Sequence, residues 1–186
     1  MSRFSIEETP LAGLRCVVRQ FRGDGRGFLS RLFCAEEFAP FFGDRRIEQI
    51  NVTFTGEVGV VRGLHFQYPP HSEMKLVCCL RGEVWDVAVD LRAGSPTFLR
   101  WHAERLSGEN GRCLLIPEGF AHGFQTLSAD VELLYLHTAA YTPDAEGGLN
   151  PLDARLGISW PLAISNLSDR DRSHALLDET FTGIEF

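Results

Sequence analysis

The chain has 186 residues, of which 44% are hydrophobic and 23% charged; this composition excludes a disordered protein and predicts one globular domain over residues 1–186. Its 18 basic and 25 acidic residues give a formal net charge of −7, which argues against a nucleic acid or a membrane surface as partner. No apolar run approaches the roughly 18 residues that cross a bilayer, and the first residues lack the pattern of a secretory signal. The five cysteines are odd in number and have no CxxC spacing, so we expect reduced thiols and a cytoplasmic location.

Strand patterns dominate the chain, and helix candidates are few. The first predicted helix covers residues 34–42. Short runs rich in β-branched and aromatic residues then predict strands over residues 47–66, 74–80, 83–91, 98–106, 112–117 and 131–138. A weaker helix pattern follows over residues 171–179. Short strands at regular intervals favour an all-β fold with a closed or double-sheet antiparallel architecture and a few short peripheral helices.

Two spaced patterns narrow this architecture to a barrel. Residues 111–126 match G-x5-P-x-G-x2-H-x3-N, with a threonine in the last place. Earlier in the chain, five residues separate Gly59 from His65, and six separate Lys75 from Gly82. These spacings, in this order, resemble the two cupin signatures, so we expect a cupin jelly-roll barrel.

The positions that hold metal ligands in cupins carry different chemistry in this chain. Gln67 replaces an imidazole and is a poor ligand for a transition ion, and Lys75, the only lysine, stands where a carboxylate is expected. An ammonium repels a divalent cation, so we expect no metal and a barrel mouth that keeps His65, Lys75 and His122 for another task. One alternative stays open: a metal-dependent cupin oxygenase or isomerase with the ligand set His65, His71, Glu73 and His122.

The three groups at the mouth suit proton transfer at carbon. A neutral imidazole removes a proton next to a carbonyl near pH 7, and a lysine stabilises the enolate oxygen that results. Return of a proton to the other face needs a separate acid, for which Tyr135 is the candidate. Alternation along its strand places Tyr135 on one face with Val131, Leu133 and His137. The alternative for Tyr135 is a core aromatic whose hydroxyl bonds to the backbone.

Longer segments identify a family. The stretch GVVRGLHFQYPPHSEMKLV over residues 59–77 closely resembles the dTDP-4-dehydrorhamnose 3,5-epimerase family. The similarity continues in order over residues 24–28, 49–53, 82–98, 106–124 and 168–171. The resemblance implies a homodimeric, cofactor-independent jelly-roll enzyme of nucleotide-sugar metabolism. Its substrate would be a 4-keto-6-deoxyhexose carried on thymidine diphosphate, epimerised at carbons 3 and 5.

The resemblance also implies roles for particular residues. His65 would be the base and Asp171 its partner, although Asp169 lies in the same SDRD stretch. Lys75 would stabilise the enolate, and Tyr135 would return the proton. The implied substrate-binding residues, among them arginines suited to phosphate oxygens, are Arg26, Gln49, Asn51, Arg62, His122, Tyr141, Glu146 and Arg170. Asp86 and Asp90 are candidates for structural partners of a barrel histidine and are assigned no chemistry.

Four departures from the family pattern affect recognition more than proton transfer. Arg31 stands where the family has an acid, and Ala140 replaces an aromatic residue that often stacks on the base. The Lys-Thr pair after the acid tyrosine becomes Leu136-His137, and the residues before KLV become Glu73-Met74. We therefore also consider a single-centre epimerase of another deoxysugar pathway and a catalytically idle protein that binds a sugar nucleotide.

Overall fold

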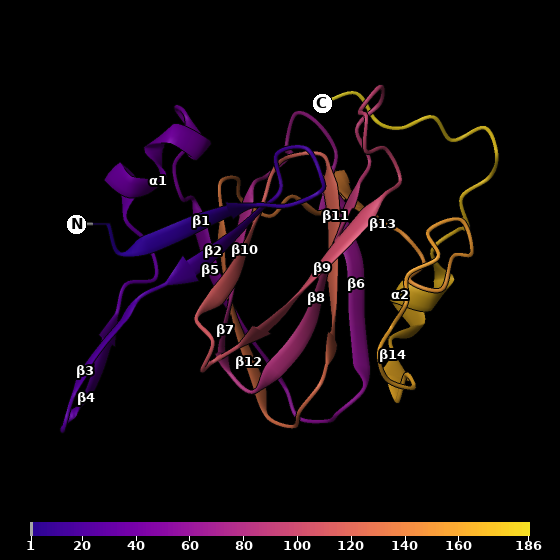
Figure 1. Cartoon of the computed structure of the whole chain (residues 1–186). Helices are drawn as coiled ribbons and strands as arrows, with labels where there is room; N and C mark the ends of the chain where they lie inside the picture. The colour runs from indigo at the N-terminus through magenta and orange to yellow at the C-terminus, as the bar shows by residue number, and fades with distance from the viewer. Residues whose placement is uncertain (1) are drawn as a thin grey trace.

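The computed structural model describes residues 2–186 and contains two large β-sheets that face each other (Figure 1). In sheet order, the first consists of β1 (Phe4–Glu8), β2 (Arg15–Arg19), β10 (Arg112–Ile116), β7 (Lys75–Arg81), β12 (Val131–His137) and β5 (Gln49–Thr55), all paired antiparallel. The second runs β13 (Glu146–Gly148), β6 (Val60–Gln67), β11 (Phe120–Thr126), β8 (Glu83–Asp90) and β9 (Trp101–Ser107). A short strand, β14 (Asn166–Leu167), pairs in parallel with β6. The predicted all-β jelly-roll barrel is confirmed.

Apolar side chains from both sheets fill the space between them. Val77 of the first sheet packs in one cluster with Val84 and Phe124 of the second. Leu133 and Tyr135 of β12 belong to the same buried cluster, which confirms the alternation predicted for this strand. The core therefore reaches along β12 as far as Tyr135.

Helix α1 (Ala35–Phe42) covers the outer face of the first sheet and matches the helix predicted over residues 34–42. Phe38 and Phe42, four residues apart on one helix face, pack with Leu115 and Leu136, whose side chains leave the sheet on its outer side. The helix ends at Gly43, which adopts φ +58° and bonds through its N–H to the carbonyl of Ala39.

Several predicted boundaries were wrong. The run over residues 47–66 is two strands, β5 and β6, because the chain turns at Gly59, whose φ of +81° a residue with a side chain rarely adopts. The strand predicted from residue 98 begins at Trp101, since Leu99 lies in a turn with φ +57°. The C-terminal helix α2 covers Asp169–Ser173 instead of residues 171–179, because Ser168 caps its start.

Other elements carry no prediction from the sequence: strands β1, β2 and β11, the short strands β13 and β14, the 3-10 turn Pro143–Ala145, and the hairpin of β3 (Phe21–Asp24) and β4 (Gly27–Ser30). The hairpin projects away from the barrel (Figure 1). Phe28 and Leu29 on it are 68% and 69% exposed. The five cysteines are free. Within residues 2–186, no helix has the length and apolar character needed to cross a membrane.

Candidate active site

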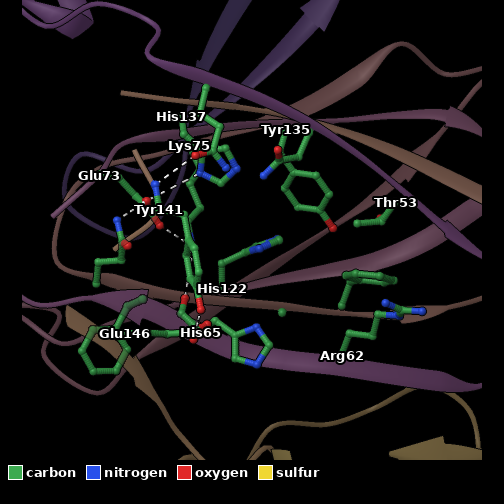
Figure 2. A pocket seen from close by; sticks show the side chains of 16 residues that line it. Thr53, Arg62, His65, Glu73, Lys75, His122, Tyr135, His137, Tyr141 and Glu146 are labelled. Atoms are coloured by element: carbon green, nitrogen blue, oxygen red, sulfur yellow. Dashed lines mark hydrogen bonds and ion pairs between the residues drawn. The ribbon is translucent and has the colours of Figure 1, made fainter. Parts of the chain in front are cut away.

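The two sheets enclose a cavity of about 370 Å³ (Figure 2). Most of the residues predicted for the site line it: Gln49, Asn51, Arg62, His65, Lys75, His122, Tyr135, Tyr141 and Glu146. Strands β5, β7 and β12 of the first sheet supply one wall, and β6 and β11 of the second supply the opposite wall. Segments far apart in the sequence therefore converge on one space.

The register of the first sheet explains its wall. His137 pairs with Gln49 on one side and with Lys75 on the other, and Tyr135 pairs with Asn51. Residues opposite one another in neighbouring strands present their side chains to the same face of the sheet. All five side chains accordingly line the cavity.

The opposite wall depends on a close approach of two strands. His65 of β6 pairs with His122 of β11, which places two imidazoles side by side. Nearby, a Cβ atom on Gly63 would lie 2.6 Å from Gly123 Cα, so a side chain has no room there. The backbone N–H of Gly63 instead donates to an Asp171 carboxylate oxygen at 3.2 Å.

Asp171, on α2, forms a close pair with His65. The distance between His65 Nε2 and Asp171 Oδ1 is 2.7 Å. Burial would raise the pKa of Asp171, but the hydrogen bond and charge of His65 outweigh burial and hold this pKa below its ordinary value. An ionised Asp171 accepts the Nε2 proton, and this leaves Nδ1 of His65 free to act as a base. Asp169 is exposed, so the structure distinguishes the two aspartates of the SDRD stretch.

Lys75 is buried in the wall opposite His65. Its ammonium donates to the backbone carbonyl of His65 at 3.3 Å and lies 3.0 Å from a carboxylate oxygen of Glu73. The ammonium therefore lies in the same cavity as His65, on the side of the first sheet (Figure 2).

Tyr135 and His122 lie deeper in the cavity. Their rings pack edge to face, with centroids 5.9 Å apart. His122 also pairs with the fully buried Asp86, at 2.8 Å between Nε2 and Oδ1, so Asp86 is the structural partner of a barrel histidine, as the sequence analysis considered. Burial raises the pKa of the Tyr135 phenol, so the hydroxyl keeps its proton at neutral pH.

A second polar group lies at the rim. The Tyr141 hydroxyl donates to Glu146 at 2.8 Å, and Arg170 forms an ion pair with the same carboxylate. Gln49 accepts from the backbone N–H of Tyr141 at 2.9 Å and so fixes this loop. Burial would raise the pKa of Glu146, but the contacts with Arg170 and Tyr141 lower it below its ordinary value.

Arg26 is not brought to this cavity. It lies on the projecting β3–β4 hairpin, where its exposed guanidinium pairs with Asp24 at 2.6 Å. Within the single chain Arg26 does not line this cavity, because the hairpin points away from the barrel (Figure 1), so its place at the substrate site stays a prediction. Arg31, the other charge of interest in this region, pairs with Glu37 of α1 at 2.9 Å.

The alternative metal-ligand set is not assembled either. Glu73 contacts Lys75 and Gln67, His122 contacts Asp86, and His71 Nδ1 lies 3.3 Å from the Thr142 hydroxyl. Within residues 2–186, the one group of three potential donor atoms within 4.8 Å of one another is His65, Asp171 and His174. Two of these donors already bond to each other, and the structure does not bring together the alternative ligand set His65, His71, Glu73 and His122.

Sequence reasoning missed three polar residues of the cavity wall: Thr53, Glu73 and His137. Alternation with Gln49 and Asn51 along β5 is a signal that identifies Thr53. His137 shares the predicted face of Tyr135, and Glu73 stood out only as a metal ligand in the alternative hypothesis and as a departure from the family pattern. Their contact with each other depends on how β7 and β12 pair, which no local pattern shows.

The fold is that of the cupins, and its cavity holds acid and base groups of the kind that move protons on carbon; together they define a cupin-fold protein with a site suited to proton transfer at carbon. Residues 8–179 match the profile of the family described as dTDP-4-dehydrorhamnose 3,5-epimerase, and the chain belongs to this family.

Individual relatives agree with that assignment. A dTDP-4-dehydrorhamnose 3,5-epimerase of Sinorhizobium fredii is 44% identical, over 84% of this chain and 81% of that protein. A dTDP-4-dehydrorhamnose 3-epimerase of Streptomyces niveus is 39% identical, over 91% and 82%. The crystal structure of dTDP-6-deoxy-D-glucose-3,5-epimerase from Legionella pneumophila, in complex with dTDP-4-keto-L-rhamnose, superposes with a TM-score of 0.91 at 39% identity and covers 98% of both chains.

Proposed function

We propose that this chain epimerises a dTDP-linked 4-keto-6-deoxyhexose by removing a proton next to the ketone and returning one to the opposite face. The observation that carries the proposal is the opposition of the His65–Asp171 pair on one wall of the cavity to Tyr135 on the other. Lys75 lies on the same wall as Tyr135. A base and an acid on opposite sides of a bound ring suit inversion at carbon.

Each group has a role in this reaction. His65 Nδ1 takes the proton from carbon 3 or carbon 5, and the electrons of the C–H bond move into the ketone to give an enolate. Lys75 stabilises the enolate oxygen. As the enolate collapses, Tyr135 gives its proton to the opposite face of that carbon. Solvent then removes the proton from His65 and restores the phenol, so no cofactor is needed.

The remaining cavity residues suit recognition of the sugar nucleotide. Amide groups of Gln49 and Asn51 and the imidazole of His122 offer hydrogen bonds to hydroxyl groups of a sugar. Arg62 lines the cavity, and Arg170 lies at its rim beside Glu146; guanidinium groups there suit a diphosphate. The Legionella pneumophila relative, which binds dTDP-4-keto-L-rhamnose, supports a dTDP-linked substrate.

We also propose that residues 1–186 act as a cytoplasmic homodimer. The projecting hairpin exposes the large apolar side chains of Phe28 and Leu29. The outer side of β5 exposes those of Ile50, Val52 and Phe54, and exposed apolar side chains that lie close together on a strand are typical of an interaction surface. Pairing of two copies through these surfaces would cover them and would carry Arg26 toward the partner's cavity. The free cysteines suit the reducing cytoplasm.

Exchange with heavy water tests the proposed reaction. Incubation with dTDP-4-keto-6-deoxyglucose in deuterated water should introduce deuterium at carbons 3 and 5, observed by NMR. Label at one carbon only would identify a single-centre epimerase, the activity that the name of the Streptomyces niveus relative describes. Absence of exchange together with tight binding of the substrate would identify an idle binding protein and overturn the proposal.

A further inference from the structure

Lys75, the proposed enolate stabiliser, is held between two oxygen acceptors. Its Nζ atom donates to the backbone carbonyl of His65 at 3.3 Å and lies 3.0 Å from Glu73 Oε1. The side chains of Lys75 and Glu73 are only 9% and 8% exposed. An ammonium carries three N–H donors, so these two contacts leave one donor for a ligand in the cavity.

Gln67 fixes the Glu73 carboxylate from its other side. Gln67 Oε1 accepts from the backbone N–H of Thr142 at 2.6 Å, and this contact sets the orientation of the amide. The NH2 group of the amide then donates to Glu73 Oε2 at 2.7 Å and to the backbone carbonyl of His71 at 2.9 Å. Each carboxylate oxygen of Glu73 therefore faces a donor, Gln67 at Oε2 and Lys75 at Oε1.

Only a carboxylate at position 73 suits both donors. An amide there would have one oxygen and one NH2 group, so it would turn a donor toward either Gln67 or Lys75. Burial would raise the pKa of Glu73, but the contacts with His137 and Lys75 hold it below its ordinary value, so Glu73 remains a carboxylate at neutral pH. The shape and the charge of this side chain both match its surroundings.

The carboxylate has two opposite effects on an enolate in the cavity. Its charge opposes the negative charge that develops on the ketone oxygen, whereas its contact with Lys75 holds the ammonium in one place. An ammonium without a partner is costly to bury, so without Glu73 the flexible lysine side chain would turn toward water. A donor that has turned away stabilises no enolate, and small displacements of such a group are costly in rate, so we expect the positioning effect to dominate.

We propose that Glu73 is a positioning residue that holds the Lys75 ammonium at the cavity wall, with one N–H donor left for the ketone oxygen of the substrate. Gln67 holds Glu73 in turn, from the position where cupins carry a metal-binding imidazole. The inference rests on the proposed function and deepens it, because it explains how the site keeps its one lysine in place.

Steady-state kinetics of Glu73→Gln decide which effect dominates. If Glu73 acts by positioning, kcat should fall by about tenfold, which corresponds to about 1.4 kcal/mol of lost enolate stabilisation. KM should stay within about twofold, because both oxygens of Glu73 already face donors of the protein. An unchanged or increased kcat would show that the carboxylate does not act by positioning, and would overturn the inference.

A double-mutant cycle tests whether Glu73 acts through Lys75. In the Lys75→Met background, Glu73→Gln should not lower kcat further, because no ammonium remains to be held. In the same background it should raise the melting temperature, since Lys75→Met alone leaves a buried carboxylate without its counter-charge, whereas it should lower the melting temperature of the unaltered protein. A further tenfold loss of kcat, or melting temperatures that shift in the same direction in both backgrounds, would overturn the inference.

Glu104 of β9 provides the matched control outside the cavity. Its two carboxylate oxygens face His102 Nε2 and Arg112 Nη2, each at 2.9 Å, and its side chain is 17% exposed. Like Glu73, it is a shielded carboxylate between two donors. Glu104→Gln should leave kcat within about twofold even where it lowers the melting temperature. Equal losses of kcat from Glu104→Gln and Glu73→Gln would show a general effect on stability and would contradict the inference.

A further measurement does not depend on turnover. Lys75 is the only lysine, so protein labelled with 15N at lysine Nζ gives a single ammonium signal in NMR. Protons of an exposed ammonium exchange with water too quickly to be observed at neutral pH, but those of Lys75 should be observed, and they should exchange about tenfold faster in Glu73→Gln. No signal from the unaltered protein, or equal exchange rates in the two proteins, would refute the inference.

The two proposals fail in distinguishable ways. If the unaltered protein introduces no deuterium into the substrate, the proposed function fails, and the Nζ signal still decides whether Glu73 holds the ammonium. If deuterium enters but Glu73→Gln keeps the kcat of the unaltered protein, the proposed function stands and the role of Glu73 is refuted.

Discussion

Replacement of Asp171 by asparagine is the sharpest test of the proposed base. The carboxylate accepts the Nε2 proton of His65 at 2.7 Å, which leaves Nδ1 free to take a proton from carbon. An amide at position 171 whose oxygen accepts from the Gly63 N–H turns its NH2 group, a donor, toward Nε2, so it favours the tautomer in which Nδ1 carries the proton. His65 would then face the substrate with no lone pair.

The expected loss of rate follows from the free energy of the lost hydrogen bond. A hydrogen bond to a charged partner contributes about 1.5–3 kcal/mol, which corresponds to a loss of roughly ten- to a hundredfold in rate. Adoption of the wrong tautomer adds to this loss, so we expect kcat for Asp171→Asn to fall by at least about a hundredfold. Asparagine keeps an oxygen that can accept from the Gly63 N–H, and the fold should therefore persist.

The assay is deuterium entry at carbon 3, followed by NMR, with Asp169→Asn as the matched control on the same helix. Asp169 is exposed and two residues away, so its substitution should leave the exchange rate within about twofold. Exchange by Asp171→Asn at the unaltered rate would refute the pairing of Asp171 with the base. An equal loss in Asp169→Asn would show that the helix charge, and not this one contact, is responsible.

Further predictions concern the acid, the enolate, pH and assembly. Lys75→Met should lower kcat by about 10²–10³-fold, the loss typical for one donor to an oxyanion, whereas a loss below threefold would remove Lys75 from this role. Tyr135→Phe should abolish inversion while deuterium still enters with retained configuration, because His65 can return a proton to the face from which it took one; loss of exchange as well would contradict separate acid and base groups. The folded pKa of Asp171 is lowered below its ordinary 3.8, so its contribution to stability is complete above about pH 5 and is lost as pH falls through the folded value. The free energy of unfolding of the unaltered protein should therefore approach that of Asp171→Asn in acid, and a constant difference in chemical denaturation would contradict this. Phe28→Asp should shift the protein to a monomer in sedimentation, and an unchanged dimer would exclude the hairpin from the interface.

Much of the barrel was predictable because its signals are local. Short runs of β-branched residues and the turns between them depend on nearby residues, and the alternation along β12 was enough to place Tyr135 on the inner face. The division of residues 47–66 into two strands was missed, because the positive φ of Gly59 depends on the chain turning there. The helix over residues 171–179 was misplaced because its start is fixed by the Ser168 cap.

The site was less predictable because it is built from distant contacts. His65 and Asp171 are 106 positions apart, and only the family resemblance connected them. The contact between Glu73 and His137 arises from the pairing of β7 with β12. The direction of the β3–β4 hairpin depends on tertiary structure, so the sequence did not show that Arg26 lies away from the cavity of its own chain.

The alternation of side chains along strand β5 limits the changes that this strand can tolerate. Gln49, Asn51 and Thr53 line the cavity, while the residues between them, Ile50, Val52 and Phe54, point outward. A slip of one position against β12 would exchange these two sets and place hydrocarbon side chains in the cavity. The cavity wall and the exposed apolar surface thus alternate residue by residue along one strand, so a shift in the backbone of β5 would alter both at once.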